Sequence, residues 1–437
     1  MQAAAPITSN PKASYLRNIP VFPEQIALFV LVTVLFFLWG MSNNLTDILV
    51  QQFRKSFELS PFSAQLVSTA NFTGYFVMAI PAALIMRRWG YKSGMVMGLI
   101  LFGSGMILFW PAAVSGQYIP FLIALFAVGC GASVLETAAN PFMAQFGPAE
   151  TSERRLNFAQ SFNPPGTILG VIIGGQFIFS GVELKASEVA AMKQAGTYAG
   201  YLHGEIMRVV PTYLTLGSVV LLFALVLSLM KFPVVSSDPN AGPGSEDQGS
   251  FAALIHYPQL WFAVIANICN IGAQICMWSN LIPYMKQYTP ASERSAAHYL
   301  TATLIVMSIG RFATTPLMKY FAANKLLGLY AFLNVLLMAL AVTRPGMLGA
   351  YAIVAASFFL SIMFPTIFAL GLKGLGPHTK LAGSFLVMAI VGGAVFPLFL
   401  GLIAKRTGSL ALGYLVPLFG FAAVAIYGFF APKARTA

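Results

Sequence analysis

Charged residues are scarce in this chain, and their scarcity excludes most soluble folds. Only 9% of the 437 residues are charged, whereas 58% are hydrophobic, and the mean hydropathy is +0.77. Soluble globular domains carry about 25% charged residues. The composition therefore predicts an all-α membrane protein that crosses the bilayer many times.

The chain also has few residues and motifs that would support enzyme or metal chemistry. The three cysteines, Cys130, Cys269 and Cys276, lie inside apolar runs without the spacing of a disulfide framework or a Cys/His metal site. None of the four histidines falls in the middle of a predicted helix, and there is no GxxxxGK[ST] motif. No combination of nucleophile, base and oxyanion donors is recognisable. We therefore expect no metal, no cofactor, no ATP hydrolysis and no enzyme activity.

The net charge of +12 comes from bases that stand singly or in pairs at the ends of apolar runs. This arrangement is typical of the positive-inside rule and not of nucleic-acid binding. If the N-terminus is inside, the inner side carries more Lys and Arg than the outer side, and the excess grows when the long segment 181–208 is set aside. The pattern favours two cytoplasmic termini.

Apolar runs separated by charged or Gly/Pro-containing turns predict twelve membrane-spanning helices. Their approximate ranges are 22–50, 63–86, 93–113, 118–146, 156–180, 209–231, 257–286, 296–322, 325–343, 347–372, 381–403 and 411–431. The turn-rich stretch between the sixth and seventh runs predicts a flexible linker between two six-helix bundles. The predicted divisions are a tail 1–21, a bundle 22–232, a linker 233–255, a bundle 256–431 and a tail 432–437.

The two predicted bundles resemble each other in sequence. Gly74 to Gly94 matches Gly310 to Gly328, because each stretch opens with glycine, contains a proline and reaches a basic turn before the next helix. Prolines also recur in the fourth and tenth runs, at Pro141 and Pro365. Such repeats are typical of transporters that rock two bundles around a central cavity.

A polar stripe in the first predicted helix is the main functional signal. Trp39, Asn43, Asp47 and Gln51 recur at intervals of four, with Asn44 beside them, so they share one face. A carboxylate in the membrane interior costs roughly 2.5 to 3.5 kcal/mol. We therefore expect this face to line a water-accessible cavity, with a structural hydrogen bond to a neighbouring helix as the alternative.

Glu136 is the second acidic residue that lies deep in an apolar run, and it shares a helical face with Gly129, Ser133 and Asn140. Low polarity favours the neutral form of a carboxyl group, so Asp47 or Glu136 could take up and release a proton during transport. The alternatives are an inert buried acid and a sodium site, for which the spacing does not supply enough oxygen ligands.

Two further stripes carry carboxamides. The fifth run has Asn157, Gln160, Asn163 and Thr167, and a Pro164-Pro165 pair directly after Asn163 should break the helix. The seventh run has Asn267, Asn270, Gln274 and Trp278. Carboxamides match vicinal hydroxyls, and a Trp face suits the C–H side of a sugar ring. A sugar is thus the expected substrate.

For Arg311 in the eighth run, a structural or gating role is favoured over ligand contact. Glycine spacings such as Gly166 to Gly170 indicate close helix packing.

Several segments together resemble the fucose-proton symporter family of the major facilitator superfamily. They are FFLWGMSNNLTDILVQQF, GYFVMAIPAALIMRRWGYKSG, ETAANPF, RLNFAQSFN and FPTIFALGLKGLG. The resemblance implies a twelve-helix fold in the bacterial inner membrane and import of a monosaccharide with protons. It also implies that Asp47 and Glu136 serve sugar binding and proton coupling, and that Asn44, Gln160, Asn163 and Gln274 face the sugar. Phe364 replaces a tyrosine expected in the fucose carrier, and Pro164-Pro165 replaces small residues.

We therefore predict a monosaccharide–proton symporter that works as a monomer in the lipid bilayer and binds no nucleic acid. The predicted proton-coupling residues are Asp47 and Glu136. The predicted sugar-binding residues are Asn43, Asn44, Asp47, Glu136, Asn140, Gln160, Asn163, Asn270, Gln274 and Trp278. The alternatives are a sodium-coupled sugar symporter, a multidrug or metabolite antiporter of the same fold, and a non-transporting membrane sugar sensor.

Overall fold

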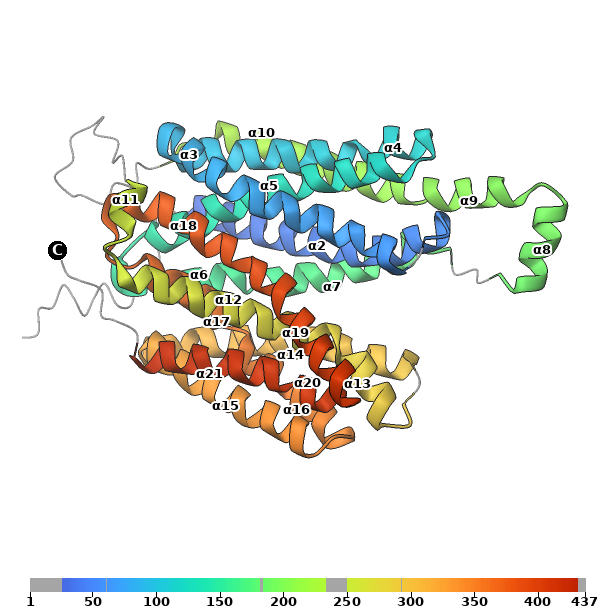
Figure 1. Cartoon of the computed structure of the whole chain (residues 1–437). Helices are drawn as coiled ribbons and strands as arrows, with labels where there is room; N and C mark the ends of the chain where they lie inside the picture. Colours follow the sequence, from blue (N-terminus) through green and yellow to red (C-terminus); the bar gives the residue numbers. More distant parts are fainter. Residues whose placement is uncertain (1–25, 60, 181–183, 233–249, 292, 431–437) are drawn as a thin grey trace, which may run out of the picture.

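The computed structural model describes residues 26–59, 61–180, 184–232, 250–291 and 293–430, and within these ranges the chain forms helices and no strands. The helices form two bundles, one from each half of the chain (Figure 1). The predicted tails 1–21 and 432–437 and most of the predicted linker 233–255 lie outside the described residues. The last part of that linker forms a short helix, α11 (Phe251–Leu254).

The first half contains five long helical passes and one broken pass. Its elements are α2 (Ile26–Ser56), α3 (Pro61–Ile107), α4 (Phe109–Ser115), α5 (Tyr118–Gln145), η2 (Ala149–Thr151), α6 (Ser152–Gln160), α7 (Asn163–Ile173), η3 (Gly174–Ile178), α8 (Ala186–Gln194), α9 (Tyr198–Met207) and α10 (Val209–Leu229). The broken pass is α6 followed by α7, and the predicted Pro164-Pro165 break is confirmed, since α7 starts at the residue before the pair.

The second half also has six passes, but its helix breaks do not all fall at the same passes as in the first half. After α11 come α12 (Pro258–Ser279), α13 (Leu281–Tyr288), α14 (Glu293–Thr314), η4 (Thr315–Lys319), α15 (Ala323–Thr343), α16 (Met347–Leu360), α17 (Met363–Leu372), η5 (Gly376–His378), α18 (Thr379–Met388), η6 (Ala389–Val391), α19 (Gly392–Thr407), α20 (Leu410–Gly413) and α21 (Leu415–Phe430). Its fourth pass is broken between α16 and α17.

These elements account for the twelve predicted passes. Nine helical stretches in the described ranges are long and apolar enough to cross a membrane. One of them holds two passes, because α3 continues through a turn at Gly90, whose φ of 76° suits glycine. The remaining passes are α2, which has a continuous apolar part at Ile26–Ser42, and the broken pair α6 and α7.

The sequence repeat corresponds to equivalent packing contacts. A Cβ atom at Gly74 would lie 2.5 Å from the carbonyl oxygen of Phe126, and one at Gly310 would lie 2.5 Å from that of Phe358. Each glycine thus lets the second pass of its half approach the fourth pass closely. The two halves therefore repeat a helix contact as well as a sequence pattern.

Helices from the two halves meet along a central seam. Helix α18 packs against α3 and α5, α14 packs against α7, and α17 packs against α6. The α6–α17 contact lies toward the end of the molecule at which α10 finishes the first half and α11 begins the second (Figure 1). We call this end the linker end.

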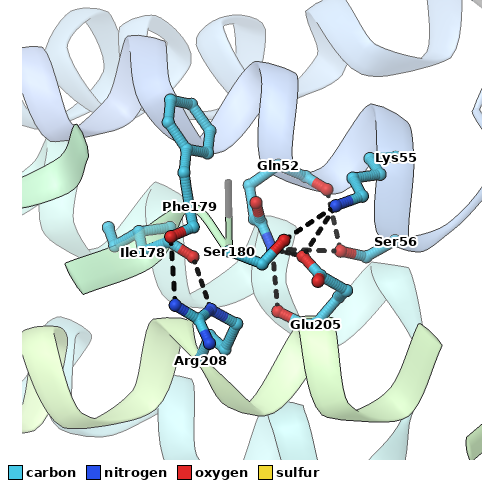
Figure 2. A network of polar contacts seen from close by, with 8 residues as sticks. All are labelled: Gln52, Lys55, Ser56, Ile178, Phe179, Ser180, Glu205 and Arg208. Carbon is cyan, nitrogen blue, oxygen red and sulfur yellow. Dashed lines mark hydrogen bonds and ion pairs between the residues drawn. The ribbon is translucent and has the colours of Figure 1, made fainter. Parts of the chain in front are cut away.

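A polar network joins three passes of the first half at the opposite end (Figure 2). Gln52 Nε2 donates to the carbonyl oxygen of Glu205 at 2.8 Å, and Lys55 Nζ lies 3.2 Å from the Glu205 carboxylate and 3.0 Å from Ser180 Oγ. Arg208 donates to the carbonyl oxygens of Ile178 and Phe179. The network fixes the end of α2 to the end of η3 and to α9.

Segment 181–208 contains more structure than the sequence interpretation gave it. The segment was treated as a long loop, but its described part forms α8 and α9, which extend beyond the bundle (Figure 1). Glu205 lies in this segment and was not predicted to be buried, yet its side chain is only 3% exposed. It is buried because Gln52 and Lys55 supply hydrogen bonds that replace water.

Candidate functional site

Glu136 lies in the middle of α5 and is enclosed by protein. Its side chain is 2% exposed, so it does not face lipid. Its Oε2 atom and the Nδ2 atom of Asn140, one turn later, are both buried without a hydrogen-bond partner among the described residues. Buried polar atoms are rarely unpaired in folded proteins. Asn140 nevertheless lies close enough to interact with the Glu136 carboxyl group, so the two side chains can bond to each other or offer an acceptor and a donor to a bound group.

The first-half carboxamides extend this arrangement from α5 to α6. Gln160 is buried, and its Nε2 atom donates to Asn140 Oδ1 at 2.8 Å. Gln160 is the last residue of α6, so the helix break positions its side chain toward α5. Three predicted site residues, Glu136, Asn140 and Gln160, are thus brought to one place.

The polar stripe of α2 is described only in part. The backbones of Asn43, Asn44 and Asp47 belong to α2, but their side chains lie outside the described part of the structure. At the start of the stripe, Trp39 Nε1 donates to Tyr75 Oη at 2.6 Å. The predicted functional roles of Asn43, Asn44 and Asp47 stay predictions.

Asn163 and two glycines of α7 lie against α2. Asn163 Nδ2 donates to the carbonyl oxygen of Phe36 at 3.2 Å, and a Cβ atom at Gly166 would lie 2.1 Å from that of Phe37. The same tight fit occurs between Gly170 and Met41. The predicted packing role of the glycines is confirmed. Asn163 is brought next to the turn that precedes the α2 stripe.

The second-half residues lie on α12. Asn270 is fully buried, and neither polar atom of its side chain has a partner among the described residues. Gln274 is half-buried, and Trp278 Nε1 donates to Ser357 Oγ at 3.1 Å, which fixes the indole ring against α16. Asn267 donates to the carbonyl oxygen of Leu386 and joins α12 to α18. No hydrogen bond among the described residues joins Asn270, Gln274 or Trp278 to the first-half cluster.

Polar contacts between the halves follow one face of α6. Glu153 forms an ion pair with Lys373 at 2.7 Å, and Asn157 Nδ2 donates to Thr366 Oγ1 at 3.0 Å. One turn later, the carbonyl oxygen of Gln160 accepts from Arg311 Nη1 at 2.8 Å. Positions 153, 157 and 160 are at i, i+4 and i+7, so a single helix face joins the two halves.

The sequence interpretation missed part of this contact. Asn157 and Gln160 were recognised as members of a stripe, but Glu153, Lys373 and Thr366 were not assigned a role. The local signal was present, because Glu153 precedes Asn157 by four residues and extends the stripe by one turn. Thr366 is 209 residues from Asn157, and Lys373 is 220 residues from Glu153. Helical spacing gives no information about partners so far away in the sequence.

The comparisons with known proteins agree with this architecture. The family model described as Major Facilitator Superfamily matches residues 28–380. The chain belongs to this superfamily. It is 38% identical over 418 residues to the L-fucose-proton symporter of Escherichia coli (strain K12), which covers 94% of this chain and 95% of the relative. It is 34% identical to the glucose/galactose transporter of Brucella abortus, over 92% of this chain and 93% of the relative.

A solved structure is similar over almost the whole length. The crystal structure of FucP, a major facilitator superfamily transporter in the outward conformation, gives a TM-score of 0.85 at 38% identity and covers 93% of this chain and 98% of that one. The predicted fold of two pseudo-symmetric six-helix bundles is therefore confirmed, and so is the predicted kinship with the fucose-proton symporters.

Proposed function

We propose that this protein is a secondary active transporter that imports a monosaccharide together with protons. The relatives named as an L-fucose-proton symporter and a glucose/galactose transporter support the substrate class. The observation that carries the proposal is the buried, unpartnered oxygen of Glu136 beside the Asn140–Gln160 hydrogen bond. A carboxyl group in this setting can exchange a proton, and the neighbouring amides can bind hydroxyl groups of a neutral sugar.

Coupling follows from the cost of an unpaired charge in a buried site. An ionised Glu136 enclosed by protein would have to be compensated by hydrogen bonds or a nearby cation, whereas the protonated form carries no net charge. If sugar binding favours the protonated site, then the loaded and the empty transporter can interconvert more easily than half-loaded forms. Such coupling requires a difference in affinity between the states.

We place both termini and the linker end in the cytoplasm, in the inner membrane of a bacterium. The Lys and Arg distribution supports this orientation. The polar contacts of α6 with α14 and α17 would then close the cytoplasmic side, and the sugar would enter from outside. We further propose that Asp47 and Asn44 of the first half and Asn270, Gln274 and Trp278 of the second complete the sugar site, in a protein that acts as a monomer.

Uptake by proteoliposomes tests this function. Purified protein is reconstituted, and a panel of labelled hexoses, deoxyhexoses and amino sugars is offered under an inward proton gradient or an inward sodium gradient. We expect at least one sugar to accumulate above its external concentration with the proton gradient alone. Accumulation only under the sodium gradient would identify sodium, and not the proton, as the coupling ion. Efflux of cationic compounds without sugar uptake would identify an antiporter.

A further inference from the structure

Arg311 occupies an unusual position for a charged residue. It lies in the last turn of α14, and its side chain is only 3% exposed. No ion pair of Arg311 with an acidic residue occurs in the part of the chain that the structure describes. Instead, Nε donates to the carbonyl oxygen of Ser361 at 2.5 Å and Nη1 to that of Gln160 at 2.8 Å. A buried guanidinium is thus compensated by two backbone carbonyl groups, one from each half.

Both carbonyl groups are available for the same reason. In a continuous helix, the carbonyl oxygen of residue i accepts from the N–H of residue i+4. Pro164 is four residues after Gln160 and Pro365 is four residues after Ser361, and proline has no N–H. Each carbonyl therefore lacks its usual helical donor. The two breaks lie in the fifth and tenth passes, at α6–α7 and α16–α17.

We propose that Arg311 is a clip that holds the two halves together at the linker end by binding both proline-freed carbonyl groups at once. The bond to Ser361 orients the guanidinium within its own half, and the bond to Gln160 reaches across to the other half. The planar fork of arginine supplies two N–H groups at fixed angles, which a lysine ammonium on the same stem cannot do.

The clip would also link the inter-half contact to the candidate proton site. Gln160 accepts from Arg311 through its backbone carbonyl and donates to Asn140 through its side chain. Asn140 lies one turn after Glu136 on α5. The residue that anchors the clip in the first half is therefore hydrogen-bonded to Asn140, the neighbour of Glu136 on α5. This role rests on the importer proposed above, since opening of the linker end would release the sugar to the cytoplasm.

Pro164→Ala and Pro165→Ala form a matched pair that tests the clip. Alanine at 164 supplies an N–H to the Gln160 carbonyl and so competes with Arg311, whereas alanine at 165 supplies one to the Ser161 carbonyl. Spin labels are attached at Arg88→Cys and Lys325→Cys, two exposed positions near the linker end, in a chain whose three native cysteines are alanine. Pulsed electron resonance then gives the distance between the halves without any substrate.

We expect Pro164→Ala to raise the ratio of long to short distances about tenfold, the effect of losing one charge-assisted hydrogen bond. Pro165→Ala should leave the distances unchanged, and Arg311→Lys should shift them in the same direction as Pro164→Ala. Arg311→Lys keeps the charge and the stem, so it tests the same contact if Pro164→Ala does not fold.

Unchanged distances in both Pro164→Ala and Arg311→Lys would overturn the clip, and so would an equal shift in Pro165→Ala and Pro164→Ala. These outcomes are independent of sugar uptake, because the distance measurement uses no substrate. Failure of uptake in the unmodified protein would overturn the importer and leave the distance result standing.

Discussion

At the residue scale, Glu136 is the side chain on which we propose that proton coupling depends. We predict that Glu136→Gln abolishes accumulation of sugar against its gradient but preserves exchange of labelled for unlabelled sugar, because glutamine keeps the shape and cannot ionise. Asp47→Asn should also lose accumulation. Uptake and exchange by proteoliposomes measure both effects, and Glu188→Gln on the exposed face of α8 is the control. Normal accumulation in both Glu136→Gln and Asp47→Asn would refute the proposed coupling.

Trp278 gives a second prediction at this scale. Trp278→Phe removes the Nε1 donor to Ser357 but keeps a flat apolar ring, whereas Trp278→Ala removes both. If the ring contacts sugar, then Phe should change the apparent KM by only a few fold, and Ala should raise it about tenfold or more. Concentration-dependent uptake gives the KM. Equal effects of the two substitutions would assign the role of Trp278 to its hydrogen bond.

The site residues could be predicted from sequence only as far as helical spacing reaches. Glu136 and Asn140 are one turn apart on one helix, so their shared face follows from the letters alone. The Asn140–Gln160 bond crosses between helices and was predicted only as membership in one site. Asn270 and Asn267 look alike in the sequence, but Asn267 bonds to the backbone of α18 and Asn270 has no partner among the described residues.

At the scale of helices, close approach of α2 and α7 depends on glycine. Gly166→Ala would introduce a Cβ atom 2.1 Å from a backbone oxygen of α2, and the two helices would have to separate. We predict a loss of roughly 1 to 3 kcal/mol in stability, the usual cost of overpacking. Thermal unfolding in detergent measures the change.

Gly401 in α19 is the matched control, because nothing lies within 4 Å of a Cβ atom built there. Gly401→Ala should leave the unfolding temperature unchanged or raise it slightly, since alanine favours helix. A similar loss of stability in both variants would mean that the α2–α7 contact does not determine the effect.

The helices themselves were largely predictable, and the exceptions have physical causes. Long apolar runs and the Pro164-Pro165 break follow from hydropathy and from the missing proline N–H. Helices α8 and α9 were not predicted, because α8 is polar and both are too short to form the long apolar run of a membrane-spanning helix. Only the folded chain shows that Gln52 and Lys55 of α2 bind the carbonyl oxygen and the carboxylate of Glu205 of α9 (Figure 2).

At the scale of the whole molecule, the ion pair between Glu153 and Lys373 joins the two halves. We predict that Lys373→Glu favours an open linker end by repulsion, and that adding Glu153→Lys restores the closed distribution. The shift should be modest, about two- to fivefold, because the Lys373 side chain is 45% exposed and an exposed partner weakens an ion pair. The inter-half distance between labels at 88 and 325 measures it. If the double variant did not recover the closed distance distribution, then the ion pair would not contribute to the contact between the halves.

The arrangement of two repeated bundles was predictable from the sequence repeat, whereas the seam between them was not. Gly74 and Gly310 mark equivalent positions within the halves. Asn157 and Thr366 are 209 residues apart, and nothing in either segment identifies the other as its partner. Sequence patterns therefore predicted the two bundles but not the polar contacts between them.

Proton movement on sugar addition tests the central claim most directly. Proteoliposomes with no imposed gradient are placed in a weakly buffered medium, a transported sugar is added outside, and the external pH is recorded. Coupled import predicts that the medium becomes alkaline as protons enter with the sugar, and that Glu136→Gln abolishes the change while sugar exchange continues. Sugar entry without any pH change in the unmodified protein, or the same pH change in Glu136→Gln, would contradict the account.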